Sequence, residues 1–299
     1  MREPTFVARP LARRRPRKGF VPFLVIVVLL GVGAGWWRVG GFDVGPAPAR
    51  AAGESPQDRG GGTNAAAAPA TSRGQARAAL DRFVDLGYPI RCGGGNERVV
   101  ALTFDDGPGP YTEQTLDLLE SAGIPATFFL NGIKLEDRFV ELPRREADMG
   151  AIGNHTWNHV DVTELSSEGM VAEIDETSRA LQEIAGVQVR MFRPPFGQYD
   201  EESEARVRAL GMVIVLWSVD SGDAAEGATG PVELRTLRDE IWPGAIILLH
   251  ENRGSTQHVL PKLLRVLDRR NLRPVTVPEL LAVDPPTVGQ LRSGTCPSG

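Results

Sequence analysis

The chain has 299 residues, of which 41% are hydrophobic and 24% are charged, ordinary values for a globular protein with one large domain or two small ones. The formal net charge is −5, yet residues 1–18 carry seven basic side chains and one acid, so the rest of the chain is strongly acidic. Because a nucleic-acid groove requires clustered lysine and arginine, this balance argues against nucleic acid as a partner.

The basic tail over residues 1–18 is followed by nineteen uncharged residues, 19–37. Nineteen helical residues rise about 28 Å, close to the hydrocarbon thickness of a bilayer. Trp36 and Trp37 stand where interfacial aromatic residues are found, and the basic flank places the N-terminus inside. We therefore expect a single-pass anchor in the cell membrane, with a cleaved signal sequence and secretion as the alternative. Both interpretations place the rest of the chain outside the cytoplasm.

Residues 38–88 are rich in Gly, Ala and Pro and predict a flexible linker, with a short amphipathic helix over 75–86. Residues 89–299 are expected to form a single catalytic domain. The two cysteines of the chain, Cys92 and Cys296, bracket this domain. In an oxidising compartment they could form a disulfide that ties the ends of the domain together, and two free thiols are the alternative.

From residue 99 onward, short apolar or β-branched runs alternate with amphipathic stretches of helical length. The predicted strands cover residues 99–104, 126–130, 151–154, 189–192, 212–217, 245–249 and 274–277. The predicted helices between them include residues 111–122, 201–210, 232–241 and 257–270. Such alternation predicts an α/β fold with a parallel sheet, here a closed or nearly closed barrel of seven units. The chemistry of such barrels lies at the C-terminal ends of the strands.

The first predicted strand ends in two adjacent acids, Asp105 and Asp106, followed by Gly-Pro. Because neighbouring side chains of an extended segment point in opposite directions, the two acids are expected to do different work, one as a metal ligand and one as a base. A simple turn is the alternative interpretation of this short motif.

The third predicted strand runs into His155 and His159, two of the four histidines in the chain. Side chains four residues apart share one face of a helical turn, so both imidazoles could reach one metal ion. The sequence therefore predicts a metal site, with a pair of surface histidines as the alternative.

Three further strand ends carry polar side chains. Arg193 ends the fourth strand and could orient a nearby carboxylate and favour its ionised form, while the prolines that follow it could fix the backbone N–H of Phe196 towards a substrate. The fifth strand is followed by Asp220 and Asp223, and the sixth ends in His250, a residue able to exchange protons near neutral pH. His258, on the next helix, is expected at the surface.

Together these motifs resemble the polysaccharide deacetylase family, the NodB-homology domain of carbohydrate esterase family four, over residues 97–282. The resemblance implies a distorted (β/α)7 TIM-like barrel and a divalent metal, Zn²⁺ first and Co²⁺ as the alternative. It also assigns a role to each matched position. The implied metal ligands are Asp106, His155 and His159. The implied catalytic groups are Asp105 as base, Arg193 as its partner, the Phe196 N–H for the oxyanion, His250 as acid and Asp223 as the acid's partner.

One position departs from the family pattern. The fourth motif usually reads Asp-x-x-Asp-Trp, whereas Ala224 follows Asp223 here, which puts substrate fit and turnover in doubt. The implied reaction is hydrolysis of N-acetyl groups on a cell-wall polysaccharide, with peptidoglycan N-acetylglucosamine or N-acetylmuramic acid as the first expectation. Chitin oligosaccharides and acetylated xylan are alternatives, as are a binding module without catalysis and a non-haem iron oxygenase, which also uses two histidines and a carboxylate.

Overall fold

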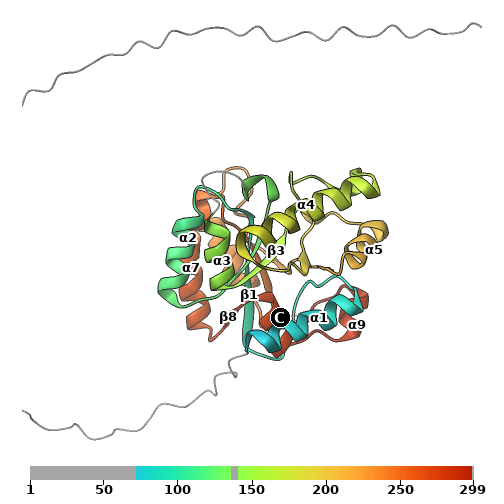
Figure 1. Ribbon diagram of the computed structural model, residues 1–299. Helices are drawn as coiled ribbons and strands as arrows, with labels where there is room; N and C mark the ends of the chain where they lie inside the picture. Colours follow the sequence, from blue (N-terminus) through green and yellow to red (C-terminus); the bar gives the residue numbers. More distant parts are fainter. Residues whose placement is uncertain (1–71, 136–140, 298–299) are drawn as a thin grey trace, which may run out of the picture. The chain divides into compact units, whose positions relative to one another are not determined.

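The computed structural model describes residues 72–135 and 141–297 (Figure 1). The predicted basic tail, the apolar segment 19–37 and most of the predicted linker lie outside these residues. Among the residues described, no helix has both the length and the hydropathy needed to cross a membrane.

The centre of the domain is one curled sheet in which all paired strands run parallel. Its order is β5-β4-β3-β2-β1-β7-β6, and β8 pairs with the first residues of β1. The strands are β1 (Val99–Gly107), β2 (Thr127–Leu130), β3 (Ala151–Asn154), β4 (Met191–Phe192), β5 (Val213–Ile214), β6 (Val219–Asp220), β7 (Ile246–His250) and β8 (Arg273–Val275). The predicted α/β class is confirmed. The seven-stranded barrel is not: β6 is an additional strand, and in the described ranges no pairing joins β5 to β6, so the sheet is a half-barrel.

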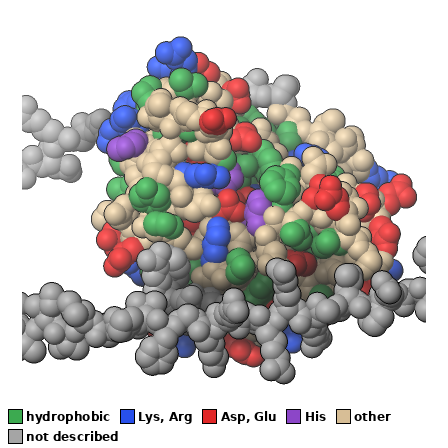
Figure 2. Space-filling model, turned by 90° about the horizontal axis from the view of Figure 1, so that it is seen from above, with side chains coloured by type: hydrophobic (Ala, Val, Ile, Leu, Met, Phe, Trp, Pro, Cys, Tyr) green, Lys and Arg blue, Asp and Glu red, His purple; other side chains and the backbone are tan. Residues whose placement is uncertain are grey.

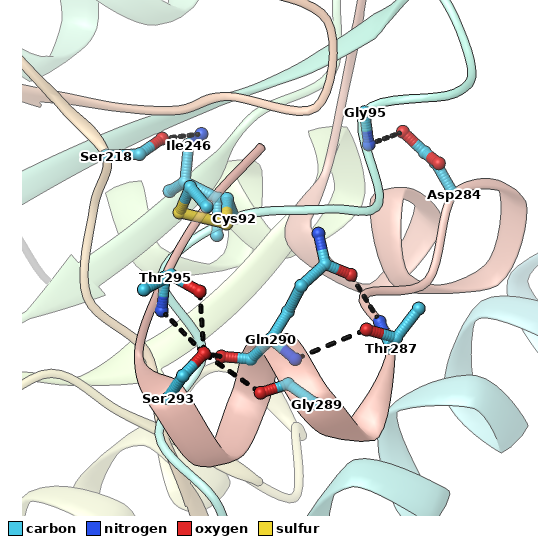
Figure 3. Close-up of a disulfide and its surroundings, with 11 residues drawn as sticks. Cys92, Gly95, Ser218, Ile246, Asp284, Thr287, Gly289, Gln290, Ser293 and Thr295 are labelled. Carbon is cyan, nitrogen blue, oxygen red and sulfur yellow. Dashed lines mark hydrogen bonds between the residues drawn. A yellow bond between two sulfur atoms is a disulfide. The ribbon is translucent and has the colours of Figure 1, made fainter. Parts of the chain in front are cut away.

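The segment before β1 lies in the opening of the sheet. Ile90 bridges to Val215 beyond β5, and Cys92 bridges to Ala245 at the start of β7. Cys92 also forms the predicted disulfide with Cys296, 204 residues away (Figure 3). The segment therefore supplies hydrogen bonds where the sheet lacks a strand, and the crosslink ties it to the C-terminal end of the chain.

Helices cover the outside of the sheet and one end of it. They are α1 (Arg73–Leu86), α2 (Thr112–Ala122), α3 (Leu142–Met149), α4 (Ser167–Ala185), α5 (Glu201–Ala209), α6 (Pro231–Glu240), α7 (Gly254–Arg269), α8 (Val277–Val283) and α9 (Val288–Ser293), with 3₁₀ turns η1 (Gly132–Leu135), η3 (Val162–Glu164) and η4 (Pro195–Gly197). In Figure 1, α2, α3 and α7 lie together on one side, while α1 and α9 lie beside one another. The predicted helix over 75–86 is confirmed as part of α1.

The alternation of side chains along β1 decides what faces the inside of the half-barrel. Val100, Leu102 and Phe104 belong to the apolar cluster that includes residues of α2 and α7. Val99 and Ala101 belong to a second cluster, with residues of β4, β5 and α8. Because side chains alternate with a period of two, the next residues on this second face are Thr103 and Asp105. The apolar interior thus gives way to polar groups at the C-terminal end of β1.

Two buried carboxyl groups lie beneath this end of the sheet. Glu146 of α3 and Glu251, just after β7, are both fully buried, and both side-chain oxygens of Glu146 and Oε1 of Glu251 have no hydrogen-bond partner among the described residues. Burial, and then the charge of Glu251, raises the pKa of Glu146 well above its usual range, and burial raises the pKa of Glu251 to about 7.

We expect Glu146→Gln to stabilise the protein at alkaline pH. A carboxyl group whose pKa is raised in the folded state holds a proton that the unfolded chain has released, so stability falls as the pH rises from about 4.5 through the folded-state pKa. Gln at this position carries no ionisable group, so the variant should be more stable than the parent at pH 8. Urea unfolding measures this difference, which should vanish near pH 4.5. A variant less stable than the parent at pH 8 would contradict the expectation.

Candidate metal centre and active site

The C-terminal ends of the strands bring the predicted site residues to one face. Asp105 lies in β1, His155 follows β3, Arg193 follows β4, and His250 ends β7. Figure 2, which views the molecule from above, shows acidic and histidine side chains at the centre of this face, with lysine or arginine side chains beside them. The site is built on strand ends, as the barrel rule predicts.

Asp106, His155 and His159 form a cluster that could hold a metal ion, since one ligand atom of each lies within 4.8 Å of the others. The Asp106 Oδ1 atom is 3.3 Å from His159 Nε2 and 3.8 Å from His155 Nε2. The Nδ1 atom of His155 lies 2.7 Å from the backbone carbonyl of Arg193. A carbonyl only accepts hydrogen bonds, so Nδ1 carries the proton and Nε2 keeps the lone pair that a metal requires. The donor set and its spacing therefore fit a divalent ion such as Zn²⁺.

Backbone conformation, rather than helical periodicity, places these ligands. Residues 155–160 form a loop, so the predicted helical turn is wrong: His159 reaches His155 because Thr156 and His159 adopt positive φ angles of 63° and 56°. Asp106 also has a positive φ, 68°, at an irregularity in the pairing of β1 with β2. At this turn the two acidic side chains do not point in opposite directions as expected. Both Asp105 and Asp106 approach the same atom, His155 Nε2, at 3.7 and 3.8 Å.

Charges around Asp106 favour its ionised, metal-binding form. Burial raises the pKa of this carboxyl, but the nearby histidines His155 and His159 and the ammonium of Lys134 together lower it below its ordinary value. Burial also lowers the pKa of His155, so its imidazole loses its proton more readily than an exposed one. A carboxylate beside neutral imidazoles is the state in which these three groups bind a metal.

Asp105 is held by Arg193, as the sequence suggests. The side chain of Arg193 is fully buried, and its Nη1 atom lies 2.7 Å from Asp105 Oδ1. The guanidinium also donates to the Thr103 hydroxyl and to the carbonyls of Val215 and Leu216. Its Cζ atom lies 4.0 Å from the ring centroid of Phe129. These contacts fix one oxygen of Asp105 and leave the other, Oδ2, facing the metal cluster.

A second carboxylate holds His250. Asp223 Oδ1 is 2.7 Å from His250 Nδ1, and Asp223 Oδ2 accepts hydrogen bonds from the His250 backbone N–H and from the Thr256 hydroxyl. Burial lowers the pKa of His250, but the hydrogen bond and charge of Asp223 outweigh burial, so the pKa lies above its ordinary value. The imidazole is therefore oriented with Nε2 pointing away from Asp223, and its protonated form is favoured.

We expect Asp223→Asn to move the titration midpoint of His250 to lower pH. The substitution removes the charge that opposes the desolvation of the imidazolium and leaves burial in place. NMR titration of the histidine ring signals measures the midpoint, and with four histidines in the chain the His250 signal is assigned by its loss in His250→Gln. Asp220→Asn is the matched control, because Asp220 is exposed and its carboxylate accepts a hydrogen bond from the Gly222 N–H instead. A midpoint equal in both variants would contradict the assignment.

The remaining predicted positions lie at the rim of the site. Phe196, in η4, has a positive φ of 59° and is 63% exposed as a residue, and its ring packs edge-on against His159 with the centroids 4.8 Å apart. Ala224 is exposed next to Asp223. His258 is exposed on α7, as expected, and takes no part in the cluster.

Other contacts were not foreseen from the sequence. Lys134 of η1 donates from Nζ to the Asp106 carbonyl at 2.7 Å, and Asn252 donates from Nδ2 to Asp106 Oδ2 at 3.2 Å. Thr103 could have been found, since it stands two residues before Asp105 on the same face of β1. Lys134, Asn252 and Thr256 carry no comparable signal, because turns and a helix of the tertiary structure bring them to the site.

Comparisons with known proteins agree with this geometry. Residues 93–215 match the family model described as polysaccharide deacetylase. A peptidoglycan-N-acetylglucosamine deacetylase of Bacillus cereus is 32% identical over 191 residues, which cover 62% of this chain and 69% of that protein. A bifunctional xylanase/deacetylase of Pseudobutyrivibrio xylanivorans is 32% identical over 62% of this chain, but this chain spans only 31% of that protein.

Solved structures of proteins from the same family are also similar to this chain. A peptidoglycan N-acetylglucosamine deacetylase matches with a TM-score of 0.63 and 29% identity, covering 69% of this chain and 98% of that one. A pseudoenzyme of carbohydrate esterase family four from Bacillus anthracis matches with a TM-score of 0.61 and 28% identity, covering 67% and 70%. The shared fold, the sequence identity and the clustered strand-end residues lead to one conclusion: the chain belongs to the polysaccharide deacetylase family.

Proposed function

We propose that this protein is a metal-dependent hydrolase that removes acetyl groups from N-acetylated sugars of peptidoglycan, breaking a carbon–nitrogen bond that is not a peptide bond. One observation carries the proposal. Asp105 and His250 are register partners on β1 and β7, beside the three-ligand cluster, and each is held by its own buried partner, Arg193 and Asp223. A base and an acid in fixed, neighbouring positions suit a reaction that takes one proton and delivers another.

In this proposal, Asp106, His155 and His159 hold a divalent ion, Zn²⁺ or Co²⁺. Such an ion supplies Lewis acidity, which polarises a carbonyl and lowers the pKa of water. Asp105 accepts the proton of the attacking water at its free Oδ2, while Arg193 keeps the carboxylate oriented. The backbone N–H of Phe196 donates to the developing oxyanion, a contact of a kind whose loss typically costs about 2.7–4 kcal/mol.

His250 completes the proposed reaction by donating a proton to the departing amine from Nε2. Its raised pKa supports this role, because the donor must hold its proton near neutral pH. The occupied base, acid and ligand positions speak against a module without catalysis, although Ala224 leaves the wall of the site near Asp223 without the usual indole. The relatives reported above include deacetylases and no oxygenase, which removes support for the iron-oxygenase alternative.

The preference for peptidoglycan rests on the relatives named for that substrate and on the expected position of the chain. The proposed single-pass anchor over residues 19–37 would hold the catalytic domain next to the cell wall. Chitin oligosaccharides are the alternative substrate, supported by a chitin deacetylase of Pestalotiopsis that is 33% identical over 183 residues. Acetylated xylan is the ester alternative, supported by the relation to the xylanase/deacetylase.

Acetate release from purified peptidoglycan, chitin oligosaccharides and acetylated xylan separates these substrates. We expect the largest kcat/KM on peptidoglycan, and free amino groups on its sugars should appear in step with acetate. Release from chitin oligosaccharides alone would overturn the preferred substrate and keep the deacetylase. Release from none of the three would overturn the reaction itself.

A further inference from the structure

A groove on the outside of the domain has a composition that the active site does not explain. It lies between α6 and α7 and has a volume of about 330 Å³. Five of its eight lining residues are cationic, and none is acidic or aromatic. The lining consists of Pro231, Leu234, Arg235, Arg238, Lys262, Arg265, Val266 and Arg269. We call it the basic groove.

Helical spacing and close packing bring these cations together. Lys262, Arg265 and Arg269 stand at i, i+3 and i+7 on α7, so they share one face, and Arg235 and Arg238 stand at i and i+3 on α6. The buried cluster beneath the groove includes Leu237 of α6 and Leu263 of α7, so the two helices pack side by side. All five cationic side chains are exposed along the groove between them.

Little in the described part of the chain neutralises these charges. Of the five cations, only Arg238 has an ion pair there, with Asp239 at 3.2 Å between exposed groups. Of the other acids of the two helices, Glu233 is buried, and Glu240 and Asp268 are exposed but do not line the groove. Gathering like charges is unfavourable without a counter-ion, and in a chain with a net charge of −5 it is also unexpected from composition. The groove therefore attracts anions to one strip of an acidic surface.

The cations identify the chemistry of the ligand. Four of the five are arginines, whose planar guanidinium groups match the oxygens of phosphate in pairs. Residues 262–269 of α7 rise about 10 Å, long enough for more than one anionic group. The lining has no aromatic ring on which a base could stack, which disfavours single-stranded nucleic acid. A concave strip also disfavours a flat membrane surface.

We propose that the basic groove binds a linear phosphodiester polymer without bases, such as a polyol-phosphate or sugar-phosphate chain. This inference goes beyond the proposed deacetylase function and does not depend on it, because the lining residues take no part in the metal cluster or its hydrogen bonds. The groove borders α7, whose first residue, Gly254, follows His250 by four positions. A bound polymer would thus be held by the same βα unit that carries the site.

The test measures binding of the full-length chain to a labelled synthetic poly(glycerol phosphate) hexamer. Binding is measured by fluorescence anisotropy over a range of salt concentrations. The triple variant Arg235→Gln, Lys262→Gln, Arg265→Gln should bind at least about tenfold more weakly at low salt, with a log–log salt slope smaller by about 2. The matched control, Arg82→Gln, Arg179→Gln, Arg206→Gln, removes the same charge from exposed positions on other helices and should bind like the parent. Both variants keep the basic residues of the N-terminal tail.

Equal weakening in the two triple variants would overturn the proposal, since it would show dependence on total charge alone. Tighter binding of a hexathymidylate, or of phosphatidylglycerol vesicles, through the same residues would overturn the choice of partner. Acetate release on a short soluble substrate should be the same in the groove variant and in the parent. This readout keeps a failure of the groove distinct from a failure of the proposed catalysis.

Discussion

The Asp105→Asn variant is expected to release acetate at least about 10³-fold more slowly than the parent while it still binds metal. Asn keeps an oxygen for Arg193, which lies 2.7 Å from Asp105 Oδ1, but it removes the charge that allows Oδ2 to accept a proton. The three ligand side chains are untouched, so the loss should appear in kcat rather than in metal content. Acetate release measured beside metal analysis checks both parts of the expectation.

The control for this variant has to separate chemistry from folding. Arg193 is fully buried, and a buried cation that loses its charged partner typically costs about 3–5 kcal/mol. Thermal unfolding should therefore accompany the assay, which is run well below the melting temperature of the variant. Asp85→Asn, the same change at an exposed acid of α1, should keep full activity. A folded, metal-loaded Asp105→Asn protein with parental kcat would remove Asp105 from the role of base.

His155→Ala should abolish both tight metal binding and acetate release. Outer partners of metal ligands already contribute about 10–100-fold to metal affinity, and His155 is itself a proposed ligand, so we expect its loss to weaken affinity by more than about 100-fold. In the parent, chelation should abolish acetate release, and added Zn²⁺ or Co²⁺ should restore it. In the variant, the same additions should restore little activity.

His258→Ala is the matched control for this second experiment, because His258 is exposed on α7 and lies outside the cluster. It should retain one metal ion per chain and full acetate release. Stoichiometric, tight metal in His155→Ala would refute the proposed ligand set. Full activity of the chelated parent would show instead that the reaction does not use a metal.

The basic groove shows that overall composition does not report how charge is distributed over the surface. The net charge of −5 argues against nucleic acid as a partner, but it does not reveal that four arginines and a lysine line one strip. The spacing of Lys262, Arg265 and Arg269 is visible in the sequence. The contribution of Arg235 and Arg238 is not, because only the packing of α6 against α7 brings the two helix faces together.

The site also combines features that the sequence predicted with features that only the fold produces. The alternation of apolar runs with amphipathic stretches was enough to predict strand ends and a parallel α/β fold, because strand and helix periods are local properties of a chain. The metal cluster was predicted from a helical spacing of His155 and His159 that the structure does not have. Predictions from local periodicity were wrong where the backbone adopts a left-handed conformation. Asp106, Thr156 and His159 have positive φ angles, which place both acids and both histidines around one point.

What the sequence determined by itself is the class of fold, the order of its units and the side chains able to do the chemistry. Only the tertiary structure decided that the sheet stays open, that residues 90–92 and the Cys92–Cys296 disulfide lie at its opening, and that Lys134, Asn252 and Thr256 support the site. These features depend on contacts between residues far apart in the chain. The free energy of such contacts comes from burial and hydrogen bonding in the assembled fold, so no local pattern records them.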